Sequence, residues 1–121
     1  GLKKRLMLAC AVRQGASIII LDEPFDGLDP AGQDTLMKLL VDLRDTGRCV
    51  LVSTHRLDIA ERIADALLVL SDGEVVFSGT GAQFARTGLP SPGKTAFEAA
   101  FAAVSTAGGR SPMAEWDGAS T

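Results

Sequence analysis

Apolar residues recur with two different periods along the first half of the chain. Residues 2–13 place apolar side chains about 3.6 positions apart, and Gly15 follows as a stop, which predicts a helix. Residues 17–21 and 49–53 are instead short runs rich in β-branched and other aliphatic side chains. Such runs are typical of strands that are buried on both faces, as in a parallel sheet.

The segment between these two strands carries the signals of a crossover helix. Asp29 supplies an N-cap acceptor, Pro30 suits the first helical position, and leucines then recur at helical spacing until Gly47. A strand, a helix and a second strand in this order predict a right-handed unit with parallel strands. The carboxyl ends of both strands are then expected at the same edge of the sheet.

Shorter elements are expected in the second half of the chain. Asp72-Gly73 suits a hairpin turn that needs positive φ, so the runs on either side of it predict an antiparallel pair. The expected elements are a helix at 57–64, strands at 66–70 and 74–77, a helical turn at 83–84, and a helix with Phe97, Ala100, Phe101 and Val104 on one stripe. Residues 106–121 have no period, which predicts a flexible tail.

The composition is that of a globular protein with one modest domain. The chain has 121 residues, of which 46% are hydrophobic and 22% charged, and a formal net charge of −3. This charge argues against nucleic acid or an anionic membrane as the main partner. Cys10 and Cys49 form neither a C-x-x-C pair nor a disulfide pattern, so we interpret them as small core residues of a reduced, cytosolic protein.

Chemistry-bearing side chains follow the two predicted parallel strands. Asp22 and Glu23 end the first strand, and His55 follows the second. Asp22 suits a Mg²⁺ ligand, direct or through water, whereas Glu23 suits a general base that polarises a water. An exposed acidic strand end and a structural histidine are the alternatives, but open α/β sheets bind ligands at this edge.

Four segments then resemble motifs of ATP-binding cassette (ABC) ATPases, in family order and at family spacing. Leu21-Asp22-Glu23-Pro24 resembles a Walker B motif with its catalytic glutamate, and Gly27-Leu28-Asp29 resembles a D-loop. Ser53-Thr54-His55 is similar to the switch-histidine loop, and Gly1-Leu2-Lys3-Lys4-Arg5-Leu6 to the end of the signature motif, with Leu2 where glutamine is usual. The resemblance covers about residues 1–80 closely and is specific because the motifs match jointly.

The resemblance implies a role for each matched residue. Asp22 would hold Mg²⁺ through water, Glu23 would activate the attacking water, and His55 would hydrogen-bond the γ-phosphate of ATP. Gly1 would offer its backbone N–H to the γ-phosphate bound by a second ABC ATPase subunit, and Asp29 would pack across that interface. The implied assembly is a head-to-tail dimer with ATP between the subunits.

The resemblance also implies an incomplete fold. We expect an α/β P-loop NTPase (ABC ATPase) three-layer fold with parallel strands, a small C-terminal β-hairpin and helices, in which residues 1–105 are the C-terminal half of the nucleotide-binding domain. The P-loop, an adenine-stacking aromatic residue and the Q-loop would precede Gly1. Because the P-loop strand of such a domain lies centrally, the first two strands here should pair directly, and the third should be either separated from them or wrongly closed onto them.

One segment matches the P-loop pattern by itself. Residues 88–95 read G-L-P-S-P-G-K-T, which fits G-x-x-x-x-G-K-[ST]. A working P-loop follows a buried strand and cradles phosphate with successive backbone N–H groups, but no strand is predicted here and Pro90 and Pro92 remove two donors. We therefore interpret the segment as a linker, with Lys94 near the start of the last helix.

The functional hypothesis is ATP binding and hydrolysis that powers transport across a membrane, in the exporter direction. The partners would be a second ATPase subunit and membrane-spanning permease subunits, and not nucleic acid, with the protein in the cytoplasm on the inner face of the cell membrane. One alternative is an ABC ATPase acting on nucleic acid or ribosomes. The other is a degenerate half-domain that only binds a partner.

Overall fold

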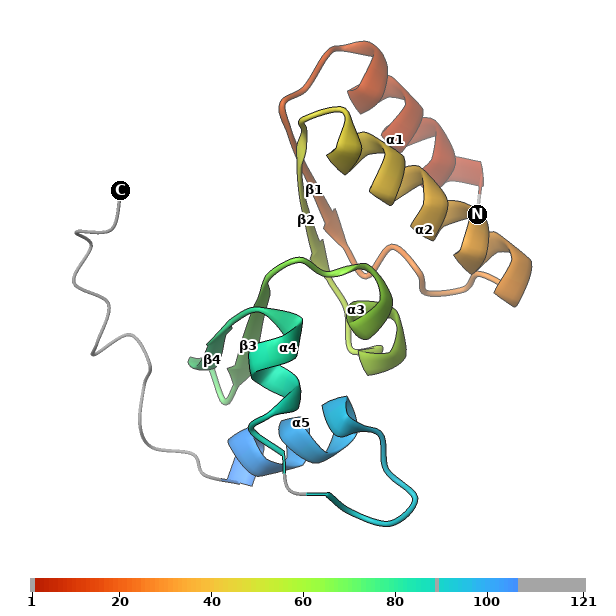
Figure 1. Ribbon diagram of the computed structural model, residues 1–121. Helices are drawn as coiled ribbons and strands as arrows, with labels where there is room; N and C mark the ends of the chain where they lie inside the picture. Colours follow the sequence, from red (N-terminus) through yellow and green to blue (C-terminus); the bar gives the residue numbers. More distant parts are fainter. Residues whose placement is uncertain (1, 89, 107–121) are drawn as a thin grey trace, which may run out of the picture. The chain divides into compact units, whose positions relative to one another are not determined.

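The structure is a computed structural model that describes residues 2–88 and 90–106, and it divides after Arg56 into two compact units (Figure 1). The first unit holds α1 (Leu2–Arg13), β1 (Ile18–Asp22), α2 (Pro30–Asp45) and β2 (Cys49–Ser53). The second holds α3 (Leu57–Ile63), β3 (Leu67–Ser71), β4 (Glu74–Gly79), α4 (Gly81–Ala85) and α5 (Ala96–Thr106). Every expected element is present, with ends that match or shift by one or two residues.

The two strands of the first unit pair as the sequence predicts. β1 and β2 are parallel and in register from Ile18 opposite Cys49 to Asp22 opposite Ser53, with α2 as the crossover. β1 begins and ends one residue later than predicted, so Asp22 is the last residue of the strand. The paired register places the last residues of both strands side by side at one edge.

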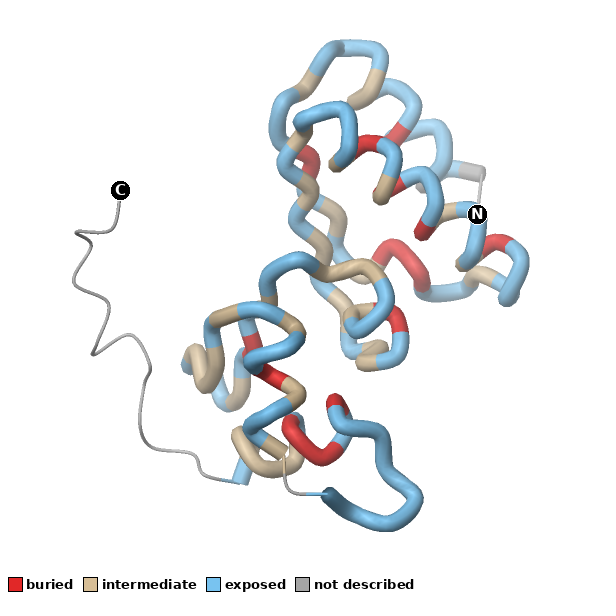
Figure 2. Tube along the Cα trace, viewed as in Figure 1, coloured by how far each residue is buried: buried red, intermediate tan, exposed pale blue. Residues whose placement is uncertain are grey.

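Burial in the first unit differs from the prediction of strands covered on both faces. Ile19 is 4% exposed and lies in the core with Met37, Leu40 and Leu43 of α2, whereas Ile20 is 69% exposed. Both helices of the unit lie on one side of the strand pair, so alternate strand side chains are uncovered (Figures 1 and 2). The expectation of full burial is therefore wrong for these described strands.

The interpretation of the two cysteines as core residues is also wrong. Cys10 and Cys49 are both free and exposed. Cys49 alternates along β2 with half-buried Val50, so it shares the uncovered sheet face with Leu51. Apolar character alone therefore did not place these thiols in the core.

The second unit is built around the predicted hairpin. β3 and β4 are antiparallel, and the turn between them places Asp72 at φ 50° and Gly73 at φ 78°, as an Asp-Gly hairpin turn requires. β3 therefore pairs with β4 in a separate two-stranded sheet, which confirms that β1 and β2 pair with each other without the third strand. The tail predicted at 106–121 lies, beyond Thr106, outside the described residues.

An aromatic cluster forms the core of the second unit. Val69, Phe84, Phe97 and Ala100 are buried together. The Phe84 ring centroid lies 4.9 Å from that of Phe77 and 5.1 Å from that of Phe97, and the second contact is edge-to-face. The hairpin and α5 thus pack through the side chain of Phe84.

The helices at the end of the second unit begin with capping boxes. Thr80 and Gln83 bond reciprocally at the start of α4, which makes the predicted helical turn a short helix. None of the described helices is long and apolar enough to cross a bilayer.

Candidate functional site

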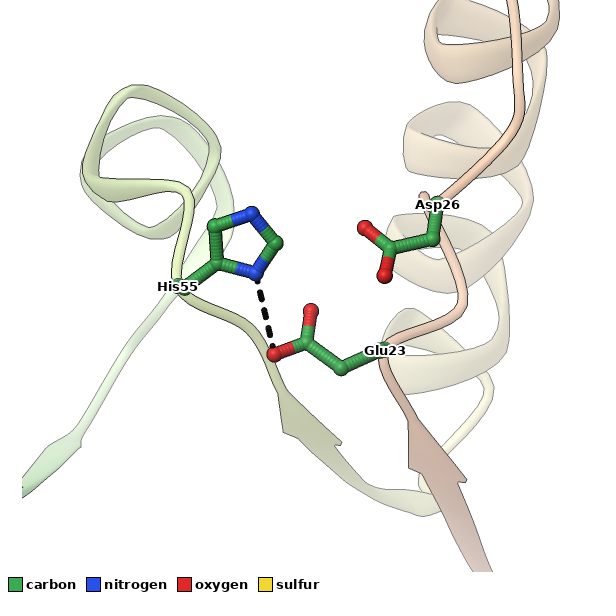
Figure 3. Close-up of side chains that lie close together, drawn as sticks. All are labelled: Glu23, Asp26 and His55. Carbon is green, nitrogen blue, oxygen red and sulfur yellow. Dashed lines mark ion pairs between the residues drawn. The ribbon is translucent and has the colours of Figure 1, made fainter.

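The candidate site lies in the first unit, at the carboxyl edge of its sheet. The turn after β1 carries Glu23 and Asp26, and the segment after β2 carries His55, so parallel pairing brings together side chains that are far apart in sequence. Figure 3 shows these three side chains pointing toward one another. One ligand-type atom from each lies within 4.8 Å of the others. The structure thus places the two predicted catalytic residues side by side.

Glu23 and His55 form a direct pair. His55 Nδ1 lies 3.1 Å from Glu23 Oε1, with 68% of the His55 side chain and 35% of the Glu23 side chain exposed (Figure 3). The hydrogen bond to Glu23, and then the charge of Glu23, raise the pKa of His55 above its ordinary value. Asp26 adds to this rise, whereas partial desolvation and the charge of Arg56 oppose it. The half-buried carboxylate therefore stabilises the protonated imidazole of His55 relative to its neutral form.

The backbone at Glu23 adopts an unusual conformation. Its φ is +43°, in the left-handed region that costs a residue with a side chain about 1 to 2 kcal/mol. The Glu23 N–H donates to the Ser53 carbonyl oxygen at 3.0 Å and to Ser53 Oγ at 3.0 Å. These bonds to the end of β2 hold the conformation that turns the Glu23 carboxylate toward His55.

The turn that follows Glu23 is anchored by buried apolar residues. Pro24 is buried and Phe25 is 1% exposed, so the chain is fixed directly after the acid. The Asp26 N–H donates to the Glu23 carbonyl oxygen at 3.3 Å, and Gly27 takes φ 76°. Asp26 is thereby held on the same side as Glu23.

Asp22 occupies a different position from the other acids. Its carboxylate oxygen Oδ1 accepts a hydrogen bond from Ser53 Oγ, and it does not belong to the group formed by Glu23, Asp26 and His55. Carboxylate oxygens are the ligands that Mg²⁺ prefers, so the donor set gathered at this edge fits that ion.

Asp29 has a clear structural role. It is the N-cap of α2, and its Oδ1 accepts a hydrogen bond from the Gly32 N–H at 2.8 Å, as the sequence predicts for a cap. A Cβ at Gly32 would lie 2.8 Å from this oxygen, so glycine leaves room for it. The predicted role of Asp29 in a dimer stays a prediction, and Gly1 lies outside the described residues.

The segment that matches the P-loop pattern forms no phosphate cradle among its described residues. It follows α4 rather than a strand, and Lys94 N–H donates to the Ser91 carbonyl oxygen at 3.2 Å in a turn. Thr95 bonds reciprocally with Glu98, through Glu98 N–H to Thr95 Oγ1 at 3.2 Å and Thr95 N–H to Glu98 Oε2 at 2.8 Å. Thr95 thus has the geometry of a helix cap, which supports the interpretation as a linker.

Two residues of the site were assigned no role from the sequence. Asp26 joins Glu23 and His55, and Ser53 bonds to both Asp22 and Glu23. The signal for Asp26 is a third acid within a turn closed by proline and glycine. The signal for Ser53 is a hydroxyl residue at the end of the strand paired with the one that carries the acids.

Comparisons with known proteins agree on one family. No protein-family model matches the chain. A putative ABC transporter ATP-binding protein of Methanothermobacter thermautotrophicus is 38% identical over 79 residues, covering 65% of this chain and 28% of the relative. The energy-coupling factor transporter ATP-binding protein EcfA of Methanocaldococcus jannaschii is 41% identical over 80 residues, covering 66% and 29%. The chain thus spans less than a third of the length of these curated relatives.

Two solved structures are also similar to this chain. CbiO1 of Clostridium perfringens, part of the ABC transporter complex CbiONQ, superposes with a TM-score of 0.61 and 35% identity over 68% of this chain and 33% of its own. UvrA2 of Deinococcus radiodurans superposes with a TM-score of 0.54 and 30% identity over 70% of this chain and 11% of its own. About two thirds of this chain is therefore similar in structure to part of each of these proteins.

Proposed function

This chain is homologous to the ATP-binding proteins of ABC transporters and has part of the ABC ATPase (P-loop NTPase) fold, and we propose that it supplies the water-activating side of an ATP-hydrolysing site that powers transport across a membrane. The observation that carries this proposal is the contact between Glu23 and His55 at the carboxyl ends of paired parallel strands. The proposal is supported by the motifs that contain Glu23 and His55, which resemble family motifs carrying a base and a phosphate-binding histidine.

Glu23 and His55 take complementary parts in the proposed reaction. Glu23 orients the attacking water and accepts its proton, because its carboxylate is held half-buried by the turn that follows. His55 donates a hydrogen bond to the γ-phosphate, and the raised pKa of His55 favours the form that can donate from both ring nitrogens. Positioning and charge stabilisation of this kind account for most of the catalysis in phosphoryl transfer.

The group that binds with ATP is Mg²⁺, and Asp22 would hold it through water. When bound, the ion neutralises charge on the phosphates. Asp22 is suited to this role because it is exposed at the sheet edge and one of its oxygens is fixed by Ser53. Glu23 keeps its separate role as base because its backbone turns it away from the strand direction.

The proposed assembly follows the family. A second ABC ATPase subunit would meet this one head to tail, with Gly1 and Asp29 at the shared ATP, and membrane-spanning permease subunits would hold the pair at the inner face of the cell membrane from the cytoplasmic side. The chain alone is expected not to hydrolyse ATP, because the described residues of the P-loop-like segment 88–95 form no phosphate cradle. The membrane-spanning subunits would select the cargo. The direction of transport, export, stays a prediction.

A non-transport ABC ATPase is the second candidate. The similarity to UvrA2, which is not named as a transporter, favours it over a purely degenerate half-domain. The net charge of −3 argues against nucleic acid as the partner of this part of the protein. ATP hydrolysis that is stimulated by DNA or ribosomes, rather than by permease subunits in membranes, would favour this candidate.

The test uses a hybrid ATPase, defined as the full 121-residue chain joined after the part of Methanocaldococcus jannaschii EcfA that precedes its matched segment. We expect the hybrid to hydrolyse ATP, and Glu23→Gln to lower kcat by about 100-fold or more while ATP still binds. The matched control is Glu61→Gln, an exposed glutamate of α3 outside the site. Near-normal turnover of Glu23→Gln would remove Glu23 from catalysis, and an inactive unmutated hybrid would contradict the proposed function.

A further inference from the structure

The side chain of Ser53 lies between the two adjacent acids of the site. Ser53 is the last residue of β2 and faces Asp22, the last residue of β1, in the parallel register. Its hydroxyl donates to Asp22 Oδ1, and the same oxygen accepts the Glu23 N–H at 3.0 Å. One hydroxyl group therefore contacts both acids, through the side chain of one and the backbone of the next.

These contacts follow from the pleat of the sheet. Asp22 and Ser53 are opposite in register and both are exposed, so their side chains extend from the same uncovered sheet face as Ile20 and Leu51. An alanine at this position would keep the backbone bond from Glu23 to the residue 53 carbonyl oxygen. It would lose both contacts of the hydroxyl, so the effect of the side chain is separable from strand pairing.

The backbone of Glu23 gives the hydroxyl a specific task. The left-handed φ of +43° is unfavourable for a glutamate, so bonds to its N–H determine whether this conformation is kept. The side chain that leaves this backbone reaches His55, with 3.1 Å between Oε1 and Nδ1. A change at Ser53 is therefore transmitted to the Glu23 and His55 pair through the backbone of Glu23.

We propose that Ser53 is a positioning residue of the ATP-hydrolysing site, whose hydroxyl holds the Asp22 carboxylate and the Glu23 backbone in fixed relation. The metal-binding acid and the base are then presented together before ATP and Mg²⁺ arrive. The role of Ser53 in the reaction rests on the proposed function. The positioning of Asp22 and Glu23 by Ser53 does not depend on that function. Residues that orient a metal ligand in this way typically change activity by about 10- to 100-fold when they are removed.

The first experiment tests the positioning on the full chain without nucleotide. His55 is the one histidine of the sequence, so its ring signal in a proton NMR titration is unambiguous. We expect Ser53→Ala to lower the pKa of His55 toward its ordinary value, because Glu23 moves away while Asp26 and Arg56 remain. Ser53→Thr, which keeps the hydroxyl on a residue suited to strands, should retain the raised pKa of His55. Ser17→Ala, an exposed serine before β1, is the matched control.

The outcomes of this titration are separable. Equal pKa values of His55 in the unmutated chain and in Ser53→Ala would overturn the positioning role. An ordinary pKa of His55 in the unmutated chain would overturn it as well, because the pair that Ser53 is proposed to position would not form. Circular dichroism of each variant checks that the same fold is compared.

The second experiment tests the role in the reaction with the hybrid ATPase. Ser53→Ala should lower kcat for ATP hydrolysis about 10-fold or more with KM for ATP within about twofold, and Ser53→Thr should restore kcat. If the unmutated hybrid is active, an unchanged kcat in Ser53→Ala would overturn the role of Ser53 but not the proposed function. A kcat that Ser53→Thr does not restore would do the same. An inactive unmutated hybrid would overturn the proposed function, and the reaction role of Ser53 with it, while the titration still decides the positioning.

Discussion

Replacing Phe84 by alanine should remove most of the stability of the second unit. Phe84 is 1% exposed and contacts the rings of Phe77 and Phe97, so truncation loses the transfer energy of the ring and leaves a cavity. Such replacements cost about 3 to 5 kcal/mol of unfolding free energy. A unit of this size has a total stability on the order of 2 to 8 kcal/mol. The variant is therefore expected to be marginal or unfolded beyond Arg56.

Urea unfolding followed by circular dichroism at 222 nm measures this effect. Phe84→Leu keeps a large apolar side chain, smaller than that of Phe, but loses the ring contacts, so it should cost about 1 to 2 kcal/mol and remain measurable if the alanine variant unfolds. Phe101→Ala is the control on α5, because its side chain is 39% exposed, and it should cost about 1 kcal/mol or less. Equal losses in Phe84→Ala and Phe101→Ala would refute the assignment of Phe84 to the core.

Three further predictions concern the first unit and the linker. Glu23→Gln should lower the pKa of His55 toward 6.5 in an NMR titration. Because the folded pKa of His55 is raised, the pair stabilises the fold below pH 6.5, and this stabilisation is lost as the pH rises through the raised pKa. The unfolding free energy of the variant should therefore fall less with rising pH than that of the unmutated chain. Asp29→Ala should lower unfolding free energy by about 1 kcal/mol in urea titrations, whereas Asp29→Asn, which keeps a capping oxygen, should not. Lys94→Ala should leave the ATP affinity of the hybrid ATPase within about twofold in calorimetric titration, and a tenfold loss would show that residues 88–95 bind phosphate.

The order of elements and the composition of the site follow from local signals in the sequence. Asp29 and Pro30 mark the start of α2 because an N-cap acceptor and a fixed φ act within one turn of the chain. Asp72 and Gly73 mark the hairpin because few residues accept positive φ. Parallel pairing then brings Glu23 and His55 to the same edge of the sheet, so the proximity of these two residues is also predictable.

The features that the sequence did not reveal depend on what covers each surface. Ile20 and Cys49 belong to apolar runs, yet both are exposed, because helices lie on one side of this strand pair. Periodicity gives the strand but not the number of its faces that are covered. Shape complementarity with a covering layer is a long-range property that no short window contains.

The positive φ of Glu23 was likewise not predictable, although it explains why the side chains of two adjacent acids have different contacts. In an ordinary strand, Asp22 and Glu23 would point to opposite faces of the sheet, and one of them would face α2. The left-handed turn at Glu23 ends the alternation, so the second acid leaves the pleat and meets His55 at the edge. Ser53 bonds to both acids from the paired strand, so this arrangement needs only residues of the first unit. The contact between Glu23 and His55 is thus set by strand pairing and by the turn at Glu23, both within the first unit.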